Sequence, residues 1–335
     1  MMQEERVSVV IPAYNASKTI DDCLTSILKQ DFSDYEVVVV DDGSTDDTSE
    51  KVKRYPVKLM RSPHQGAPGA RNVGFEASKG NIVIFLDSDC IVGRNLIVNL
   101  IRPLLNPEIG VTQAWWDNID KDKLVPSLIF KVYEYLVPNI KYPDYLWSYC
   151  FAIRRELFEA VGKFDPATGI GADDIELAQR IVKAGYRIYL MRELRVKHLF
   201  PQSLLAHIKR HIKTARDQFV YVSESKKFMC NQRINAVEYV KFILHGLTML
   251  ALFFIPLSPI PFLVLLMLSL SSHVPMTFWA MRDSWKYILI LPFAFITELS
   301  WVVGSLAGLV TLLKKRENPR MREYPVKKRN HNEMV

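Results

Sequence analysis

The sequence predicts an α/β domain with a mostly parallel sheet, followed by transmembrane helices near the C-terminus. Short apolar runs alternate with helical stretches through the first part of the chain, and this order gives a parallel sheet with right-handed crossovers. One apolar run, residues 82–86, ends in the triplet Asp87-Ser88-Asp89. Two long stretches, 242–270 and 287–313, together contain one charged residue, Glu298. A membrane-crossing helix needs about 20 apolar residues.

Four apolar runs have the length and β-branched content of buried strands: residues 7–11, 36–40, 57–60 and 82–86. Helices are predicted in the three intervals between them. The first begins at Ser17, the second ends near Arg54, and the third spans residues 69–78 and stops at Gly80.

The segment after the first strand carries no Gly-x-Gly-x-x-Gly, which disfavours a dinucleotide site. Pro12, Tyr14 and Asn15 stand there instead. An aromatic ring and an amide are therefore available to stack on a base and to hydrogen-bond it. The second strand ends in another polar pair, Asp41 and Asp42.

Asp87 and Asp89 point to the same side of the strand exit, because side chains alternate along a strand. Ligands of open parallel sheets bind outside the carboxyl ends of the strands. Mg²⁺ is usually held by one or two carboxylates together with substrate phosphates. The triplet therefore suggests a metal and a phosphate-bearing ligand. A second such triplet, Asp120-Lys121-Asp122, follows no strand and is predicted to be solvated loop.

Composition limits the possible partners. The net charge is +7, but residues 314–335 contain eight Lys or Arg against three Glu, a net of +5. A basic excess concentrated in a short tail argues against a nucleic-acid groove and favours a membrane surface or a solvated tail. The four cysteines show no ligand-like spacing, so reduced thiols are expected. The polar first residues and the early Pro12 predict no signal peptide.

The C-terminal part is predicted to be a membrane region. Pro256, Pro259 and Pro261 interrupt the first apolar stretch, which is therefore one kinked span or two helices. The second stretch is followed by basic residues from Lys314, a flank typical of the cytoplasmic side. Two crossings, with the N-terminal domain and the tail both cytoplasmic, fit best. A buried core helix is the alternative for each stretch.

Between the two parts, residues 202–222 read as a basic amphipathic helix lying at a membrane interface. Its basic residues include His207 and His211 as well as lysines and arginines. The predicted organisation is a catalytic domain at 1–200, interfacial helices at 201–238, a transmembrane region of two or three helices at 239–313, and a basic cytoplasmic tail at 314–335.

A helix is predicted from about residue 171 to Ala184, with Asp173, Asp174 and Glu176 in its first turn. Acidic residues there are common capping residues. Catalysis by one of the carboxylates is the alternative.

Six segments in fixed order resemble a known family. They are Val-Val-Ile-Pro-Ala-Tyr-Asn (9–15), Val-Val-Asp-Asp-Gly-Ser-Thr-Asp (39–46), Gly-Ala-Arg-Asn-Val-Gly (69–74), Asp-Ser-Asp (87–89), Arg-Arg-Glu-Leu-Phe-Glu-Ala-Val-Gly-Lys-Phe-Asp (154–165) and Asp-Asp-Ile-Glu-Leu-Ala-Gln-Arg (173–180). Over roughly residues 6 to 200 the chain is similar to the family 2 glycosyltransferases, which have the GT-A fold.

The resemblance implies inverting transfer of a sugar from a UDP- or GDP-linked donor. Asp89 would bind Mg²⁺ or Mn²⁺ at the diphosphate, and Asp87 would hold ribose and sugar hydroxyls or water molecules of the metal. The other residues implied to bind the donor are Pro12, Tyr14, Asn15, Asp41, Asp42 and Arg71.

Inversion requires one general base on the acceptor hydroxyl, and Asp174 matches the family's catalytic Asp. Asp173 stands where the family usually has Glu, which puts its contact with the acceptor in question. His198 matches a histidine that ligates metal or phosphate, with an ordinary surface histidine as the alternative. The Gln-x-x-Arg-Trp motif of processive members is absent, which favours transfer of one sugar per encounter.

We expect a lipid-linked acceptor at the cytoplasmic membrane face: a polyprenyl phosphate, a lipid-linked glycan or a glycolipid. Lys209, Arg210 and Lys213 are hypothesised to hold its anionic group; contact with lipid headgroups is the alternative. Two other interpretations stay open, namely a non-processive enzyme of polysaccharide or exopolysaccharide assembly and a non-catalytic subunit of a membrane assembly. No Gly-rich basic loop follows the first strand, which disfavours a sugar nucleotidyltransferase.

Overall fold

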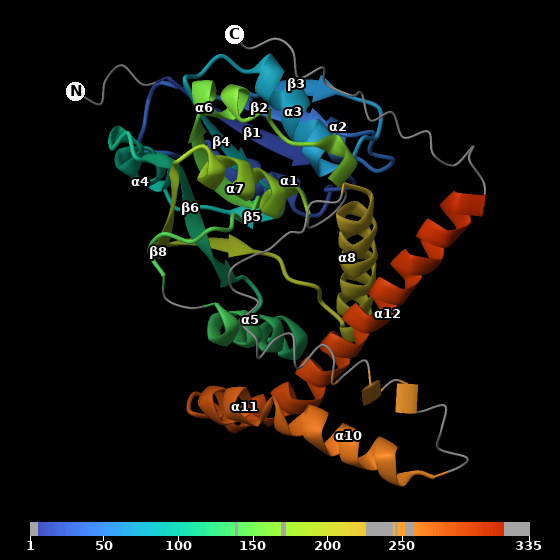
Figure 1. The fold of residues 1–335 in the computed structure, drawn as a ribbon. Coiled ribbons are helices and arrows are strands. Elements are labelled where there is room, and N and C mark those ends of the chain that lie inside the picture. The colour runs from blue at the N-terminus through green and yellow to red at the C-terminus, as the bar shows by residue number, and fades with distance from the viewer. Residues whose placement is uncertain are drawn as a thin grey trace.

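The computed structural model describes residues 6–137, 140–168, 172–225, 244, 247–248, 250–251 and 258–317. Its centre is an eight-stranded sheet in the order β3-β2-β1-β4-β7-β6-β8-β5 (Figure 1). In chain order the strands are β1 (Val7–Ala13), β2 (Tyr35–Asp41), β3 (Lys58–Arg61), β4 (Ile82–Leu86), β5 (Cys90–Ile91), β6 (Ile109–Asn118), β7 (Cys150–Arg154) and β8 (Arg187–His198). The predicted fold class is confirmed.

The first four strands form a parallel block, since β1 pairs in parallel with β2 and β4, and β2 with β3. Strand β7 runs antiparallel to its neighbours β4 and β6, and β8 returns parallel to β6. The short β5 pairs antiparallel with the end of β8. The carboxyl ends of β1, β2 and β4 therefore meet at one edge, where open α/β sheets bind their ligands.

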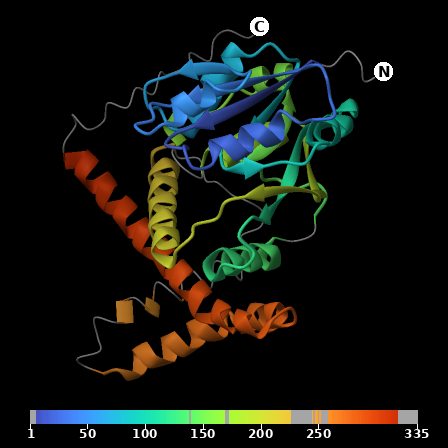
Figure 2. The same ribbon diagram turned by 180° about the vertical axis from the view of Figure 1, so that it is seen from behind.

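Helices cover both faces of the sheet. In chain order, the helices up to residue 225 are α1 (Ile20–Ile27), α2 (Thr48–Val52), α3 (Ala67–Ala77), α4 (Leu96–Ile101), α5 (Leu124–Leu136), α6 (Arg155–Ala160), α7 (Asp173–Lys183) and α8 (Leu204–Ser225). Successive side chains of β1 point to opposite faces of the sheet. Val9 therefore packs in one buried cluster with Leu24 of α1, and Val10 packs in another with Phe75 of α3. Helices α3, α6 and α7 lie on the face seen in Figure 1, and α1 on the face seen in Figure 2.

Beyond α8, the described residues include α10 (Ile260–Ser271), α11 (Val274–Met281), the 3-10 helix η4 (Trp285–Leu289) and α12 (Ile290–Glu317). Two segments are long and apolar enough to cross a membrane, Ile260–Met281 and Trp285–Lys314. The second of these coincides closely with the predicted span 287–313.

The first candidate span, Ile260–Met281, covers the later part of the predicted stretch 242–270. The described residues 244, 247–248 and 250–251 of its earlier part are also helical. Pro259 caps α10 and Pro261 lies in its first turn, and proline is tolerated at a helix start but not in its interior. Most of residues 242–257, and nearly all of the predicted basic tail, lie outside the described residues.

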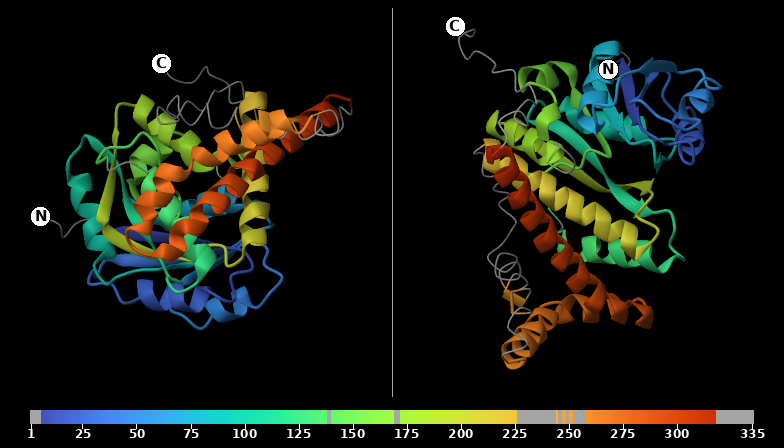
Figure 3. Two further views of the ribbon diagram at one scale, coloured as in Figure 1. Left: turned by 90° about the horizontal axis from the view of Figure 1, so that it is seen from below. Right: turned by 90° about the vertical axis from the view of Figure 1, so that its right-hand side faces the viewer.

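Helices α8 and α12 lie side by side (Figure 3), and glycines make the contact close. A Cβ atom at Gly304 would lie 2.5 Å from the carbonyl oxygen of Ile212, and one at Gly308 would lie 3.0 Å from the carbonyl oxygen of Arg216. Spacing of small residues by four positions places them on one helix face and lets two backbones approach. The α8–α12 pair is therefore packed backbone against backbone.

The two histidines of α8 belong to this contact, not to an exposed basic face as the sequence suggested. His207 is buried, its Nε2 lies 3.1 Å from the Thr297 hydroxyl, and its ring stacks on Phe293. His211 packs edge-on near Trp301. Burial lowers the pKa of His207 to about 4 and that of His211 to about 3. Both imidazoles are therefore neutral at pH 7.

The C-terminal helices also dock on the α/β domain. Met276 and Ala280 of α11 and Ile290 of α12 belong to the same buried cluster as one face of the sheet. Lys131 of α5 forms an ion pair with Asp283, which follows α11. The opposite side of these helices is apolar and exposed, with Ile260, Leu263, Met267, Phe278, Trp285, Leu306, Leu309 and Val310. An extended apolar surface of this kind indicates contact with a membrane or a protein partner.

The close α8–α12 contact gives a stability prediction. We expect Gly304→Leu to lower the free energy of unfolding by about 1–3 kcal/mol, because the added side chain has no room against α8. Val303→Leu is the control, since Val303 is 37% exposed on the same helix. Thermal unfolding of the two purified variants in detergent measures the difference. Equal melting temperatures would contradict the packing described here.

Candidate active site

The loops after β1 and β2 are joined at the carboxyl edge of the sheet. The Asp42 backbone N–H donates to the carbonyl of Ala13 over 2.8 Å. Asn15, at a φ of +50°, accepts from the Thr45 backbone N–H with its side-chain oxygen over 2.9 Å. Its own N–H donates to the Ser44 hydroxyl over 3.0 Å. Asparagine tolerates this left-handed conformation better than most residues, so Asn15 fixes the shape of both loops.

Asp41 and Asp42 are both buried at the end of β2. Asp41 accepts from the Ser44 backbone N–H over 2.9 Å and from the Ser49 hydroxyl. Burial acts to raise the pKa of Asp41, but these hydrogen bonds outweigh it and the pKa is lowered. Asp42 accepts from the backbone N–H groups of Gln65 and Gly66 over 2.9 and 2.8 Å. Both carboxylates thus brace the loops, and their predicted contacts with base and ribose stay predictions.

The predicted base-binding residues include an exposed aromatic surface. Pro12 is buried in β1, whereas Tyr14 is 48% exposed. The Tyr14 ring stacks on His64, with centroids 4.1 Å apart, and His64 Nδ1 lies 3.0 Å from a carboxylate oxygen of Asp42. Sequence reasoning missed His64 because nothing in its local pattern distinguishes it from a loop residue.

Arg71 connects the predicted donor and acceptor residues. It lies on α3, is 3% exposed, and donates over 2.7 Å to Asp87 and over 2.9 Å to Asp173. Burial would lower the pKa of the Arg71 guanidinium, but the charges of the two carboxylates outweigh it and raise the pKa. The three residues come from α3, the end of β4 and the start of α7. The buried Arg71 guanidinium therefore connects helix α3 to the end of β4 and to the start of α7.

Asp174 lies beside this group in the first turn of α7. It is half-buried, and the backbone N–H of Ser148 is hydrogen-bonded to its carboxylate. Burial, and next the charge of Asp173, raise the pKa of Asp174 to about 7. A general base is most effective when its pKa lies near the working pH. The arrangement thus suits proton abstraction and is more than a helix cap.

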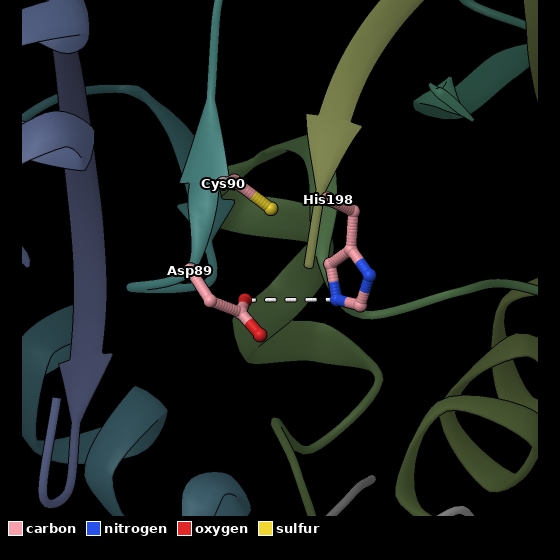
Figure 4. Close-up of side chains that lie close together, drawn as sticks. All are labelled: Asp89, Cys90 and His198. Carbon is pink, nitrogen blue, oxygen red and sulfur yellow. Dashed lines mark ion pairs between the residues drawn. The ribbon is translucent and has the colours of Figure 1, made fainter. Parts of the chain in front are cut away.

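Asp89 and His198 converge across the β5–β8 pair (Figure 4). Register places Cys90 opposite His198, and Asp89 Oδ1 lies 3.6 Å from His198 Nε2. Ligand atoms of Asp89, Cys90 and His198 all lie within 4.8 Å of one another, enough to hold a metal ion. Burial raises the pKa of the Cys90 thiol well above its usual value, and a thiol binds metal only as thiolate. The carboxylate and the imidazole are the ligands that fit.

The structure separates Arg210 from Lys209, two of the three basic residues proposed for the acceptor. Successive helix residues are about 100° apart, so Arg210 and Lys209 point in different directions from α8. The charge of Arg210 acts on Asp89, whose pKa burial raises and His198 and Arg210 lower. It also acts on Tyr133 of α5. Lys209, Arg210 and Lys213 are all exposed, and among them Arg210 is the one whose charge is a leading influence on Asp89 and Tyr133.

The second acidic triplet has a structural role. Asp120 accepts from the Gln202 side-chain amide over 2.7 Å, and Lys123 donates to the same side chain over 2.7 Å. Asp122 is exposed. The triplet thus belongs to a surface loop, as predicted, and is tied to the segment before α8. The stated reason was wrong, because a strand, β6, ends at Asn118 just before it.

Comparison with known proteins agrees with this geometry. Residues 8–162 match the family model described as glycosyl transferase family 2. Glycosyltransferase AglE of Haloferax volcanii is 42% identical over 204 residues, 54% of this chain and 63% of that protein. The glucosyltransferase WfgD of Escherichia coli, which acts on α-D-GlcNAc-diphosphoundecaprenol with UDP-Glc, is 33% identical over 132 residues, 38% of this chain and 52% of that protein.

The fold has a match along nearly its whole length. The mannosyltransferase PcManGT of Pyrobaculum calidifontis, solved with GDP-Man and Mn²⁺, has a TM-score of 0.59 at 22% identity. The match covers 91% of this chain and 87% of that one. At this identity it establishes a shared GT-A fold and no more.

This chain therefore carries a glycosyltransferase domain of family 2, as the ordered motifs predicted. The chain spans only 63% and 52% of the two curated relatives described above. The substrates and partners of those relatives are therefore not assigned to this chain by similarity.

The raised pKa of Asp174 gives a prediction. Its pKa is about 7 in the folded state and about 3.9 in unfolded chains. The folded state binds more protons between these values, so the free energy of unfolding falls as pH rises through this window. The Asp174→Asn variant has no carboxyl group to titrate at this position, so its free energy of unfolding should not fall in this pH window. We expect the variant to match the native protein near pH 4 and to exceed it by roughly 3 kcal/mol at pH 7.

Chemical denaturation at several pH values measures this difference. Asp122→Asn, which removes an exposed carboxylate, is the control and should show no comparable trend. A stability difference for Asp174→Asn that stays constant with pH would contradict the raised pKa.

Proposed function

We propose that the protein transfers a sugar, with inversion, from a nucleotide-diphosphate sugar to a lipid-linked acceptor at a membrane surface. The observation that carries this proposal is the convergence of Asp174, Arg71, Asp87 and Asp89 at the carboxyl edge of the sheet. Four acidic or basic groups from distant parts of the chain meet there, one of them poised as a base.

The donor would bind across the loops after β1, β2 and β4. The base would stack on Tyr14, the ribose would contact the Asp41–Asp42 loop, and Asp87 would reach sugar hydroxyls. Asp89 and His198 would hold Mg²⁺ or Mn²⁺, both of which accept carboxylate and imidazole ligands. When bound, the metal neutralises charge on the leaving diphosphate. Arg71 pairs with Asp87 and orients its carboxylate.

Asp174 would take the proton of the attacking acceptor hydroxyl. Asp173 beside it is paired with Arg71, so its charge is both neutralised and fixed in place. Inversion follows because one base serves a single in-line displacement, and no second nucleophile is needed. The family 2 domain and the mannosyltransferase fold support this assignment.

Membrane attachment is proposed from the exposed apolar helices α10, α11 and α12. Helix α12 packs along α8, so its opposite face, with Leu306, Leu309 and Val310, is the one free to meet lipid. The catalytic domain would sit on the cytoplasmic side, where nucleotide sugars are made. The lipid-linked acceptor of WfgD supports an acceptor of the same class.

Transfer itself is the test of this proposal. Membranes containing the protein are incubated with UDP- or GDP-sugars, Mg²⁺ or Mn²⁺, and lipid-linked acceptors, and radiolabel is followed into the organic phase. We expect one donor to be used, and Asp174→Asn to reduce turnover by at least about a hundredfold. Asp122→Asn serves as the control. Equal transfer by Asp174→Asn would show that another group is the base.

The basic residues of α8 are tested by their acceptor affinity. We expect Arg210→Ala to raise the acceptor KM about tenfold, the effect of losing one charged hydrogen bond. Lys209→Ala, on another side of the same helix, should leave KM nearly unchanged. An unchanged KM for Arg210→Ala would exclude its role in binding the anionic part of the acceptor.

A further inference from the structure

An aromatic cluster lies near Asp174, through Tyr133 and the residue that precedes Ser148. Trp116 of β6 contacts Trp147 and Tyr133, with ring centroids 4.2 and 5.4 Å apart. Trp116 is buried, whereas Trp147 and Tyr133 pack against the core on one side and are only half-buried. The cluster thus presents part of two rings outside the hydrophobic core.

Trp147 is tied to the candidate base through the backbone. The next residue, Ser148, is hydrogen-bonded to the Asp174 carboxylate by its N–H. Tyr133 of α5 contacts the same Trp116 ring, and its hydroxyl is close enough to feel the charges of both Arg210 and Asp174. The Tyr133 hydroxyl and the backbone beside Trp147 therefore both lie near one carboxylate.

Trp147 is also held rigidly. Gln113, buried in β6, accepts from the Trp147 backbone N–H over 2.9 Å and donates to the Tyr145 carbonyl over 3.0 Å. The Trp147 ring packs edge-on against Tyr145, with centroids 4.5 Å apart. Side chains that are fixed before binding lose little entropy when a ligand arrives. The cluster has the character of a preformed binding surface.

We infer that the reacting end of the acceptor is a sugar ring, seated on Trp147 and Tyr133 beside Asp174, and not a bare lipid phosphate. This inference rests on the proposed function and narrows its acceptor class. The apolar C–H face of a sugar packs well on an aromatic ring, and ligand sites combine aromatic walls with a few polar groups. The Tyr133 hydroxyl supplies such a group.

The chemistry of the reaction favours the same choice. An acceptor hydroxyl oxygen attacks the anomeric carbon, its proton passes to Asp174, and the bond to the diphosphate breaks with the electron pair leaving on the nucleotide. A phosphate monoester is largely ionised at pH 7, with a second pKa near 6, so its oxygen needs no base. A phosphate anion would also meet the carboxylates of Asp87, Asp89, Asp173 and Asp174.

The cations of the site fit this assignment. Arg71 is already paired with two carboxylates, and among the described residues Arg210 has no ion pair or hydrogen-bond partner. A sugar attached to a lipid through a diphosphate would place its ring against Trp147 and its charged linker toward Arg210.

The first experiment compares acceptors that share one lipid. Farnesyl diphosphate carrying glucose, galactose, mannose or N-acetylglucosamine is offered in parallel with farnesyl phosphate, and transfer is measured with the preferred donor. We expect transfer to at least one sugar-bearing lipid and none to farnesyl phosphate. Transfer to farnesyl phosphate, or donor hydrolysis with transfer to no sugar-bearing lipid, would overturn the inference.

The second experiment tests the cluster itself. We expect Trp147→Leu to reduce kcat/KM for the sugar-bearing acceptor roughly thirtyfold, the effect of losing an aromatic anchor, and Trp147→Phe to restore most of it. Trp285→Leu is the matched control, since Trp285 is 79% exposed on η4. An effect of Trp147→Leu no larger than that of Trp285→Leu would refute the role of the ring.

Donor binding separates failure of this inference from failure of the proposed function. Calorimetric titration with the nucleotide sugar and Mn²⁺ should give the same Kd for the native protein and Trp147→Leu. Saturation-transfer NMR with the methyl glycosides should show contact with aromatic protons that Trp147→Leu loses. Intact donor binding without glycoside contact would reject the sugar site alone, whereas absent donor binding would reject the proposed function.

Discussion

The buried Arg71 guanidinium is the interaction on which the candidate site depends. It lies between Asp87 and Asp173, so it joins the exit of β4, the body of α3 and the start of α7. Removing one partner of a buried charge network leaves the others uncompensated, at a cost of about 3–5 kcal/mol. The network also fixes geometry, because a planar guanidinium holds two carboxylates in set directions. The predicted donor residue Asp87 and the predicted acceptor residue Asp173 are thereby held in a fixed relative position.

The carboxylates of the candidate site have different environments. Asp41 is surrounded by hydrogen-bond donors and its pKa is lowered against the effect of burial, whereas burial and Asp173 raise the pKa of Asp174 to about 7. Environments that push the pKa values of two acids apart suit them to different tasks. The acid braced by donors supports a loop, and the acid with a raised pKa can accept a proton.

The C-terminal helices belong to the same physical body as the α/β domain. Residues of α11 and α12 share a buried cluster with the sheet, and Gly304 and Gly308 bring α12 onto the backbone of α8. Helix α5 lies between these parts, carrying Lys131 toward Asp283 and Tyr133 toward the site. An acceptor anchored in a membrane would therefore meet a catalytic domain whose position relative to that membrane is set by packing.

The sequence by itself determined the four parallel strands β1 to β4, the acidic triplet and the family, because apolar periodicity and ordered motifs are local properties of the chain. It did not indicate the antiparallel β5 and β7. The sequence also indicated Asp174 as the catalytic base, but only through its resemblance to the family 2 glycosyltransferases. Tertiary structure decided what depends on distant contacts: that Arg71 pairs with Asp173, that His207 and His211 face α12, and that Arg210 is separated from Lys209 around α8. Burial and charge neighbours are set by residues far apart in the chain, and no local pattern encodes them.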